Sequence, residues 1–307
     1  RFLTYLITAL NRLPELETAI GNGALQMAQS SQQPLPETIL IAAMNDIELL
    51  PEKLVLVLDD SHLIDSQTIH ESLNFLIENL PTQLHLVITT REDPPISISR
   101  LRARGQLLEI RAIDLRFSSV ESAEFLNRVM GLNLSSEDIA ALETRTEGWI
   151  TGLQMAAISM QGSKDLEGFI KSFAGSHRYV LDYLIEEVLE RQSESVQMFM
   201  LQTAILDRLT GSLCDAVTGQ NNGQMILESL DHNNLFIIPL DEERRWYRYH
   251  HLFSDLLRQR QKQTQSENIP ALHIRASEWF SQEGANREAI KHSLAAKEYG
   301  RAIELIE

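Results

Sequence analysis

The sequence predicts an α/β domain followed by mostly α-helical domains. Near the N-terminus, apolar strand patterns at residues 54–58 and 84–91 alternate with amphipathic helices, as in a parallel β-α-β sheet. From residue 118 onward helical patterns with capping signals dominate, and one hairpin pattern interrupts them at residues 235–250. We therefore expect four domains, at residues 1–117, 118–206, 207–262 and 263–307.

Composition is that of an ordinary soluble globular protein, with 307 residues, 43% hydrophobic and 23% charged. The 27 basic and 43 acidic residues give a net charge of -16, which disfavours binding of nucleic-acid phosphates by this surface as a whole. Cys214 is the only cysteine and is expected to be a small buried residue, so an intramolecular disulfide is excluded. No apolar run approaches the roughly 20 residues of a membrane span, and no signal peptide is evident. We expect a cytoplasmic protein without a membrane partner.

The apolar run Leu54–Leu58 is the central strand of the predicted sheet, and its pattern predicts burial on both faces. Asp59 and Asp60 follow directly, where ligands of open α/β sheets bind. This is the form of a Walker B element, in which Asp59 helps to hold Mg²⁺ and Asp60 polarises an attacking water. The structural alternative is that an acid at this place caps the following helix.

Helices and further strands surround the central strand. Helical spacing of apolar residues predicts helices from Leu3 to Leu13, over 35–50, over 66–80 and, shorter and basic, over 96–104. Gln106–Ile110 is expected to form a third strand. Together these elements predict a right-handed β-α-β-α-β unit.

Arg91 ends the second strand, at the sheet edge to which Asp59 and Asp60 belong. Arginine binds phosphate oxygens through a planar fork and keeps its charge, so it suits a site for a metal-bound phosphate. The alternative is an ordinary surface ion pair with Glu92, Asp93 or another acid.

One expected element is missing. The 307 residues hold no Gly-x-x-x-x-Gly-Lys-Ser/Thr loop, and no Gly is followed by Lys. The chain also begins without Met, inside an amphipathic helix pattern. We therefore expect it to be an inner portion of a longer protein, preceded by the phosphate-binding loop and its strand.

The helical region begins with two capping boxes, at Ser118 and Ser135. Gly148 and Gly152 in the segment 144–160 allow close approach of a neighbouring helix or of a nucleotide base. Further helices are expected near 178–191 and 194–206.

Residues 207–262 have the pattern of a winged helix, with helices near 211–218 and 222–232, a hairpin, and a closing helix from His251. The acidic turn at 241–243 argues against DNA binding by the wing. The pair His250–His251 lacks the partners of a metal site, and we favour a packing or phosphate-contacting role. From Pro270 a helix–turn–helix repeat of the tetratricopeptide (TPR) kind begins, and we expect the array to continue beyond residue 307.

Four segments together closely resemble the MalT-like, large ATP-binding regulators of the LuxR family, which are STAND-class signalling ATPases. They are Leu54–Leu63, Leu86–Pro95, Thr146–Gln154 and Trp246–Phe253. The resemblance covers essentially the whole chain. It implies an incomplete P-loop NTPase sheet, a helical domain, a winged helix and the start of a TPR-like repeat array.

The resemblance also implies a mechanism. In that family an ADP-bound monomer opens when an inducer, a small molecule or a protein, binds the C-terminal repeats. The opened form exchanges ADP for ATP, self-associates and presents a C-terminal helix-turn-helix to promoter DNA. By position, Asp59 resembles the Mg²⁺-associated acid, Asp60 the catalytic acid and Arg91 the sensor of the γ-phosphate. His250 resembles the winged-helix residue that meets the β-phosphate of ADP, with His251 as the alternative.

The missing loop sets limits on activity. We expect ATP hydrolysis in the full-length protein and little or none in this chain alone. A different class of protein stays open as the alternative, namely a catalytically inactive protein-interaction scaffold with the same fold. A DNA-binding module acting through the winged helix is disfavoured by the net charge.

Overall fold

A computed structural model describes residues 1–306 except 11–20, 31, 33, 162–165 and 174–177. The chain divides into two compact units, Arg1–Glu109 and Ile110–Glu307, and each is considered by itself. The four predicted domains are a finer division than this one and stay predictions.

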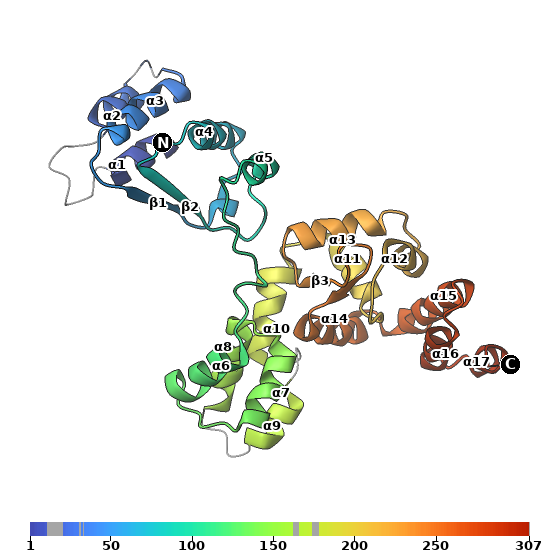
Figure 1. The fold of residues 1–307 in the computed structure, drawn as a ribbon. Coiled ribbons are helices and arrows are strands. Elements are labelled where there is room, and N and C mark those ends of the chain that lie inside the picture. The colour runs from blue at the N-terminus through green and yellow to red at the C-terminus, as the bar shows by residue number, and fades with distance from the viewer. Residues whose placement is uncertain (11–20, 31, 33, 162–165, 174–177, 307) are drawn as a thin grey trace. The chain divides into compact units, whose positions relative to one another are not determined.

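The first unit packs helices against a two-stranded parallel sheet (Figure 1). In chain order its elements are α1 (Phe2–Leu10), α2 (Asn22–Gln29), α3 (Pro36–Glu48), β1 (Leu54–Leu58), η1 (Ser61–Leu63), α4 (Gln67–Glu78), β2 (Leu84–Ile88) and α5 (Ile98–Ala103). The parallel register runs from Leu54 beside Leu84 to Leu58 beside Ile88. The predicted β-α-β arrangement of these two strands is confirmed, whereas Leu13 of the predicted first helix lies outside the described residues.

The prediction that β1 is buried on both faces is wrong. Leu54 and Leu56 join the core of the first unit, but Val55 and Val57 are 65% and 55% exposed. The alternation follows from strand geometry, because successive side chains point to opposite faces and the described helices cover one face only. Apolar composition alone does not reveal whether the second face is covered.

The third strand predicted at Gln106–Ile110 is also wrong, because these residues have no regular structure. In the described part of the chain, β1 and β2 pair only with each other. The segment makes local contacts instead: the N–H of Gln106 donates to the carbonyl of Leu101, and Glu109 accepts two hydrogen bonds from Arg102. A strand needs a paired neighbour, and without one Leu108 is 86% exposed.

The second unit opens with short helices around one apolar core. They are α6 (Ser119–Ala123), the π-helical turn η2 (Glu124–Val129), α7 (Ser136–Thr146), α8 (Ile150–Met160), α9 (Leu166–Ser172), α10 (Arg178–Leu184), the π-helical turn η3 (Ile185–Leu189) and α11 (Glu194–Thr203). Both predicted capping boxes are present, at Ser118 with Glu121 and at Ser135 with Asp138. Each satisfies main-chain donors that a helix start leaves open.

A winged helix follows in the same unit, as the sequence predicts. Its elements are α12 (Gly211–Thr218), α13 (Gly223–His232), β3 (Ile237–Pro239), β4 (Tyr247–Tyr249) and α14 (His251–Thr264). The two strands pair antiparallel, and Leu209 adds an antiparallel bridge to Tyr247. Cys214 is fully buried in the core, which confirms its predicted packing role.

The described chain ends in packed helices. They are η4 (Ser266–Asn268), α15 (Ile269–Gln282), α16 (Asn286–Ala295) and α17 (Tyr299–Glu304). Hydrogen bonds join α15 to α16, between Ser277 and Ser293 and between His273 and His292. The assignment of these helices to a TPR-like array stays a prediction. Within the residues that the structure describes, no helix has both the length and the apolar character needed to cross a membrane.

Candidate functional site

The sequence predicts a site at the carboxyl ends of the two parallel strands. Asp59 and Asp60 follow β1 directly and are exposed. Because Leu58 lies beside Ile88 in the parallel register, the residues after both strands share one edge of the sheet. Asp60 adopts the left-handed conformation, with φ of 50°, where aspartate is tolerated better than most residues.

Thr89, the first residue after β2, holds the turn that carries both acids. Its hydroxyl donates to Oδ1 of Asp59 and accepts the main-chain N–H of Asp60 at 3.1 Å. Its own N–H donates to the carbonyl of Leu58 at 2.9 Å, and its carbonyl accepts the N–H of Ser61 at 3.0 Å. Sequence reasoning missed Thr89, although a threonine directly after a strand and opposite two acids is a usable signal.

Arg91 lies three residues beyond the end of β2 and is exposed. It belongs to the same unit and the same strand edge as Asp59 and Asp60. The strand pairing puts Asp59 and Asp60 at this edge with Arg91 three residues past the end of β2, and the predicted convergence of the three side chains on one phosphate stays a prediction. The role of Arg91 as a phosphate sensor stays a prediction.

This edge suits a hydrated cation and its phosphate in its donor chemistry. Carboxylate oxygens are the ligands that Mg²⁺ prefers. In the described chain, two further polar atoms of the same turn are buried without a hydrogen-bond partner, Oγ of Ser61 and Nδ1 of His62. Nδ1 of His62 lies 3.9 Å from Oδ1 of Asp60. Across the described residues, however, no group of three or more His, Cys, Asp or Glu is arranged to hold a metal ion, so Mg²⁺ here would depend on water and phosphate ligands.

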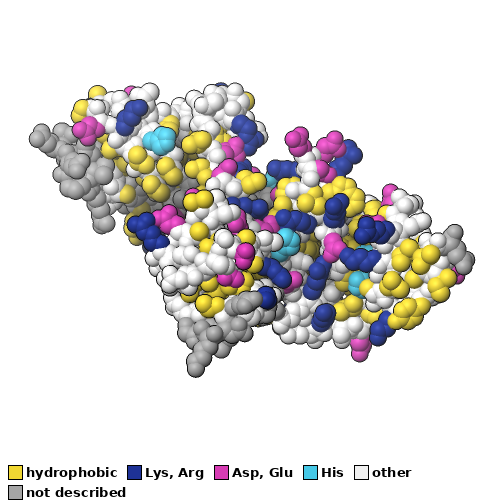
Figure 2. Space-filling model, turned by 60° about the horizontal axis from the view of Figure 1, so that its bottom comes forward, with side chains coloured by type: hydrophobic (Ala, Val, Ile, Leu, Met, Phe, Trp, Pro, Cys, Tyr) yellow, Lys and Arg dark blue, Asp and Glu magenta, His cyan; other side chains and the backbone are white. Residues whose placement is uncertain are grey.

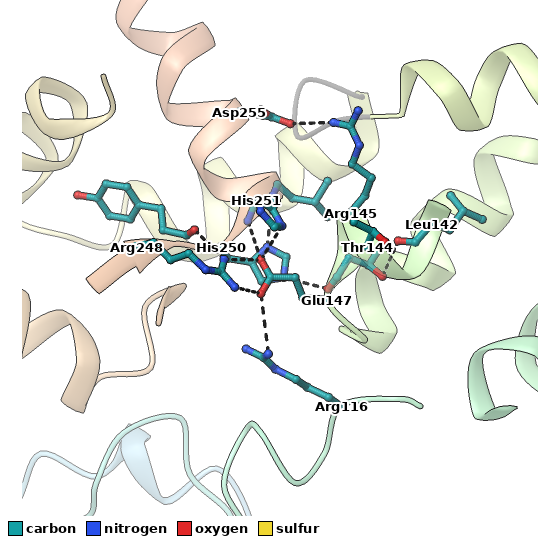
Figure 3. A network of polar contacts seen from close by, with 12 residues as sticks. Arg116, Leu142, Thr144, Arg145, Glu147, Arg248, His250, His251 and Asp255 are labelled. Carbon is teal, nitrogen blue, oxygen red and sulfur yellow. Dashed lines mark hydrogen bonds and ion pairs between the residues drawn. The ribbon is translucent and has the colours of Figure 1, made fainter. Parts of the chain in front are cut away.

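The second unit contains a different polar cluster, centred on Glu147 (Figure 3). The carboxylate accepts two parallel hydrogen bonds from the Arg248 guanidinium, each at 2.8 Å. The main-chain N–H of His251 donates to Oε1 at 3.0 Å, and Nδ1 of His251 lies 3.0 Å from the same oxygen. Arg116 is more distant, at 3.8 Å from Oε2. The cluster connects the turn after α7 to β4 and to the start of α14.

Glu147 is nearly enclosed, with a side chain that is 8% exposed. Burial by itself would raise the pKa of the carboxyl. The Arg248 hydrogen bond, the positive charge around it and the His251 N–H outweigh burial and lower the pKa to about 2. Glu147 is therefore ionised at neutral pH, and it stays charged inside the protein because its partners are charged or strongly polar.

His250 lies directly beside this cluster but serves packing in this conformation. Its side chain packs edge-on against Trp149 and Phe236. Nε2 donates to the carbonyl of Thr146 at 2.9 Å, and Nδ1 accepts the N–H of Leu252 at 3.3 Å. Burial lowers the pKa of His250 to about 4 in spite of the neighbouring Glu147 carboxylate, so the ring is neutral at pH 7.

His250 and His251, the two candidates for a nucleotide contact, differ in how their ring nitrogens are engaged. Both ring nitrogens of His250 are engaged by the protein, whereas the His251 side chain is 53% exposed and only its Nδ1 faces Glu147. A phosphate contact by His250 would require its present hydrogen bonds to break. The predicted role of His250 stays a prediction, and His251 is the more accessible of the two in this conformation.

Packing explains both glycines of the segment 144–160. Gly148 has φ of +73°, and a Cβ there would lie 2.6 Å from the carbonyl oxygen of Phe117. A Cβ on Gly152 would lie 2.7 Å from the Trp149 ring. Close approach within the protein is therefore sufficient to require glycine at both positions. A hollow of about 410 Å³ opens beside Gly148, lined by Arg116, Phe117, Ala140, Glu143, Thr144, Glu147 and Gly148.

Sequence reasoning also missed Glu147 and Arg248 as partners, since they are separated by 101 residues. A charged residue followed by glycine between two helices signals a left-handed turn, and Glu147 has φ of 52°. No local pattern identifies its partner.

Comparison with known proteins places these features in context. Residues 185–269 match the family described as the MalT winged helix domain. The chain is 34% identical over 310 residues to the HTH-type transcriptional regulator MalT of Yersinia enterocolitica and 33% identical over 298 residues to that of Klebsiella pneumoniae. It is 31% identical over 307 residues to the serine/threonine-protein kinase PknK of Mycobacterium tuberculosis.

These matches cover nearly all of this chain but only part of each relative. They include 100%, 96% and 100% of the chain for the Yersinia, Klebsiella and Mycobacterium proteins, and 34%, 33% and 27% of those proteins. The chain thus spans between about a quarter and a third of the length of the curated relatives that it matches.

Proposed function

We propose that this chain is the ATP/ADP switch portion of a transcription regulator. Its match to the MalT winged helix domain and its similarity to MalT regulators support a MalT-like chain. The carrying observation is the shared edge of β1 and β2, which brings Asp59, Asp60 and Arg91 to the carboxyl ends of parallel strands. In the same chain a winged helix follows. The switch would couple binding of an inducer to self-association and transcription activation.

The relatives support a switch more than an output domain. One is named a protein kinase and the others are named transcriptional regulators, yet all resemble this chain over nearly its whole length. A segment shared by proteins with different outputs is suited to controlling an output. Kinase activity or promoter recognition would then belong to other parts of those proteins.

Each residue of the strand edge has a proposed part. Asp59 would hold Mg²⁺ through a water molecule. When bound, the Mg²⁺ ion would supply positive charge at the phosphates. Asp60 would orient and deprotonate the attacking water, and Arg91 would bind the terminal phosphate. In the winged helix His250, or His251 in its place, would contact ADP.

A nucleotide can drive the switch only if its contacts differ between the two states. Arg91 would favour the ATP-bound state, because ADP lacks the phosphate that the guanidinium binds. The winged-helix histidine would favour the ADP-bound state. Inducer binding at the C-terminal helical repeats would shift the balance toward exchange and assembly.

DNA recognition is assigned to a helix-turn-helix outside this chain. The net charge of the chain is -16. On the face shown in Figure 2, Lys and Arg side chains are interspersed with Asp and Glu. Phosphate-backbone binding depends on a concentration of positive charge, so we expect the DNA contact elsewhere in the protein.

The test is nucleotide-dependent assembly of the intact protein from its source organism. Sedimentation velocity with ADP, ATP and a slowly hydrolysed ATP analogue is expected to show a monomer with ADP and larger species with ATP and inducer. Arg91→Ala should abolish the ATP-dependent species, whereas Arg104→Ala, another exposed arginine of the same unit, should not. Unchanged assembly of Arg91→Ala would remove Arg91 from the sensor role.

A second function has one observation in its favour. The sequence contains no phosphate-cradling Gly-Lys-Ser/Thr loop. A protein that lacks this loop altogether would act as an interaction scaffold with the same fold and without catalysis. Absence of nucleotide binding by the intact protein would favour this scaffold.

A further inference from the structure

Thr89 contacts both of the acidic residues that follow β1 through a single oxygen atom, and this requires a group that can donate and accept a hydrogen bond at once. A threonine hydroxyl has one proton to donate and two lone pairs to accept. Here the proton goes to Oδ1 of Asp59, and a lone pair receives the main-chain N–H of Asp60. One side-chain atom therefore bonds to both consecutive acidic residues.

The main chain of Thr89 strengthens this arrangement independently of the hydroxyl. Its N–H binds the carbonyl of Leu58, and its carbonyl binds the N–H of Ser61, at 2.9 and 3.0 Å. These two bonds continue the parallel pairing past the end of β2. Removal of the hydroxyl should consequently leave the turn in place and free only the two contacts made by Oγ1.

The hydroxyl fixes which part of Asp59 faces a ligand. With Oδ1 bound to Thr89, Oδ2 is the oxygen left for a water molecule of a hydrated cation, since it has no hydrogen bond within the described chain. The exposed carboxylate would otherwise rotate about its side-chain bonds, and a fixed orientation reduces the entropy lost on binding. The same hydroxyl stabilises Asp60 in its left-handed conformation, with φ of 50°.

We propose that Thr89 is a positioning residue for the cation-bound phosphate at this edge, acting through Asp59 and Asp60. The inference rests on the proposed nucleotide-binding function and adds a residue to its site. Outer-shell partners of ligating carboxylates commonly set metal affinity, and their loss costs about 10- to 100-fold. Thr89 would act by orientation and would not itself contact the phosphate.

The test compares three variants of the intact protein. Thr89→Val keeps the size and the β-branched shape but removes the hydroxyl, and Thr89→Ser restores the hydroxyl. Thr90→Val is the matched control, because the neighbouring Thr90 hydroxyl donates to the Glu92 carbonyl at 2.7 Å and contacts neither acid in the described structure. Calorimetric dissociation constants for ADP, measured with Mg²⁺ and with EDTA, separate the cation-dependent affinity from the rest.

Thr89→Val is expected to weaken ADP binding by about 10-fold or more in Mg²⁺ while leaving the affinity in EDTA unchanged. Thr89→Ser should recover most of the loss, and Thr90→Val should match the wild type. The midpoint temperatures of thermal unfolding of the nucleotide-free variants should remain within a few degrees of the wild-type value. This pattern separates orientation of the acids from general destabilisation.

Three results would overturn the inference, and they are distinguishable. Equal Mg²⁺-dependent affinity of Thr89→Val and wild type would remove Thr89 from the site while leaving the proposed function intact. Failure of the wild type itself to bind ADP in Mg²⁺ would remove the proposed function and this inference with it. Equal losses in Mg²⁺ and in EDTA would assign Thr89 a purely structural role.

Discussion

Asp59 and Asp60 at the end of β1 are exposed, whereas Glu147 in the second unit is 8% exposed. Glu147 binds Arg248 through two hydrogen bonds and also binds His251. Asp59 is contacted by a neutral threonine hydroxyl. The contrast separates two uses of a carboxylate: neutralised by cations it connects segments of the fold, and held by a neutral donor at the surface it keeps its charge for a ligand.

Breaking the buried carboxylate should have the largest effect on stability. Glu147→Gln keeps the shape but leaves the Arg248 charge without its partner, at a cost of about 3–5 kcal/mol. All three tryptophans, Trp149, Trp246 and Trp279, lie in the second unit, so their fluorescence in urea follows its unfolding. A loss below about 1 kcal/mol, the size found for exposed pairs, would contradict the central role of Glu147.

Acid should weaken the region around Glu147 in two stages. Burial lowers the pKa of His250 from 6.5 to about 4. The unfolded chain therefore takes up this proton first, and the stabilisation present above pH 6.5 is lost as the pH falls toward 4, by about 3 kcal/mol. Glu147, whose pKa is lowered from 4.5 to about 2, gives a second loss between those values.

The measurement is the free energy of unfolding from tryptophan fluorescence at pH 7.5, 6, 5 and 4. His250→Gln should show a shallower fall between pH 6.5 and 4 than the wild type, even if its stability at pH 7.5 is lower. Identical slopes for the two proteins would show that His250 is not buried as a neutral ring. His292, whose pKa burial also lowers to about 4, should account for part of the slope that remains.

A smaller effect is expected when the geometry of the pair changes but its charge does not. Lysine cannot reproduce the two parallel hydrogen bonds that Arg248 makes to Glu147. Arg248→Lys should therefore destabilise the second unit by about 1–2 kcal/mol, less than Glu147→Gln. A cost as large as that of Glu147→Gln would mean that the fork geometry outweighs the charge.

The exposed acids should give the smallest change in stability. Asp60→Asn preserves a residue type that tolerates the left-handed conformation, and removal of one of two adjacent like charges offsets any lost contact. We expect a change within about 0.5 kcal/mol by circular dichroism in urea. A large loss would show that Asp60 belongs to the packing of the fold and would weaken its proposed catalytic part.

Local patterns in the sequence were sufficient for most elements. Ser118 and Ser135 predict capping boxes, and the structure contains both. The hairpin around residues 235–250 lies where its apolar runs predict it. Strand pairing of residues 106–110 was wrong because pairing depends on a neighbour that composition does not specify. The prediction that Val55 is buried is wrong for a similar reason, because coverage of a sheet face depends on tertiary packing.

The candidate site divides in the same way. Asp59, Asp60 and Arg91 are predicted from the sequence because they stand at the ends of two strand patterns, and their roles stay predictions. The pairing of Glu147 with Arg248 spans 101 residues and has no local signal. Thr89 is visible in the sequence between the strand pattern and Arg91. Its role, however, depends on a parallel register that only the three-dimensional structure shows.

The most direct test of the nucleotide switch is the Mg²⁺ dependence of ADP and ATP binding by the intact protein, compared between wild type and Asp59→Asn. We expect the wild type to bind both nucleotides more tightly in Mg²⁺ than in EDTA. Asp59→Asn should lose that gain and retain the affinity in EDTA. Equal Mg²⁺ gains in the two proteins, or no nucleotide binding by the wild type, would contradict the assignment of this strand edge as the nucleotide site.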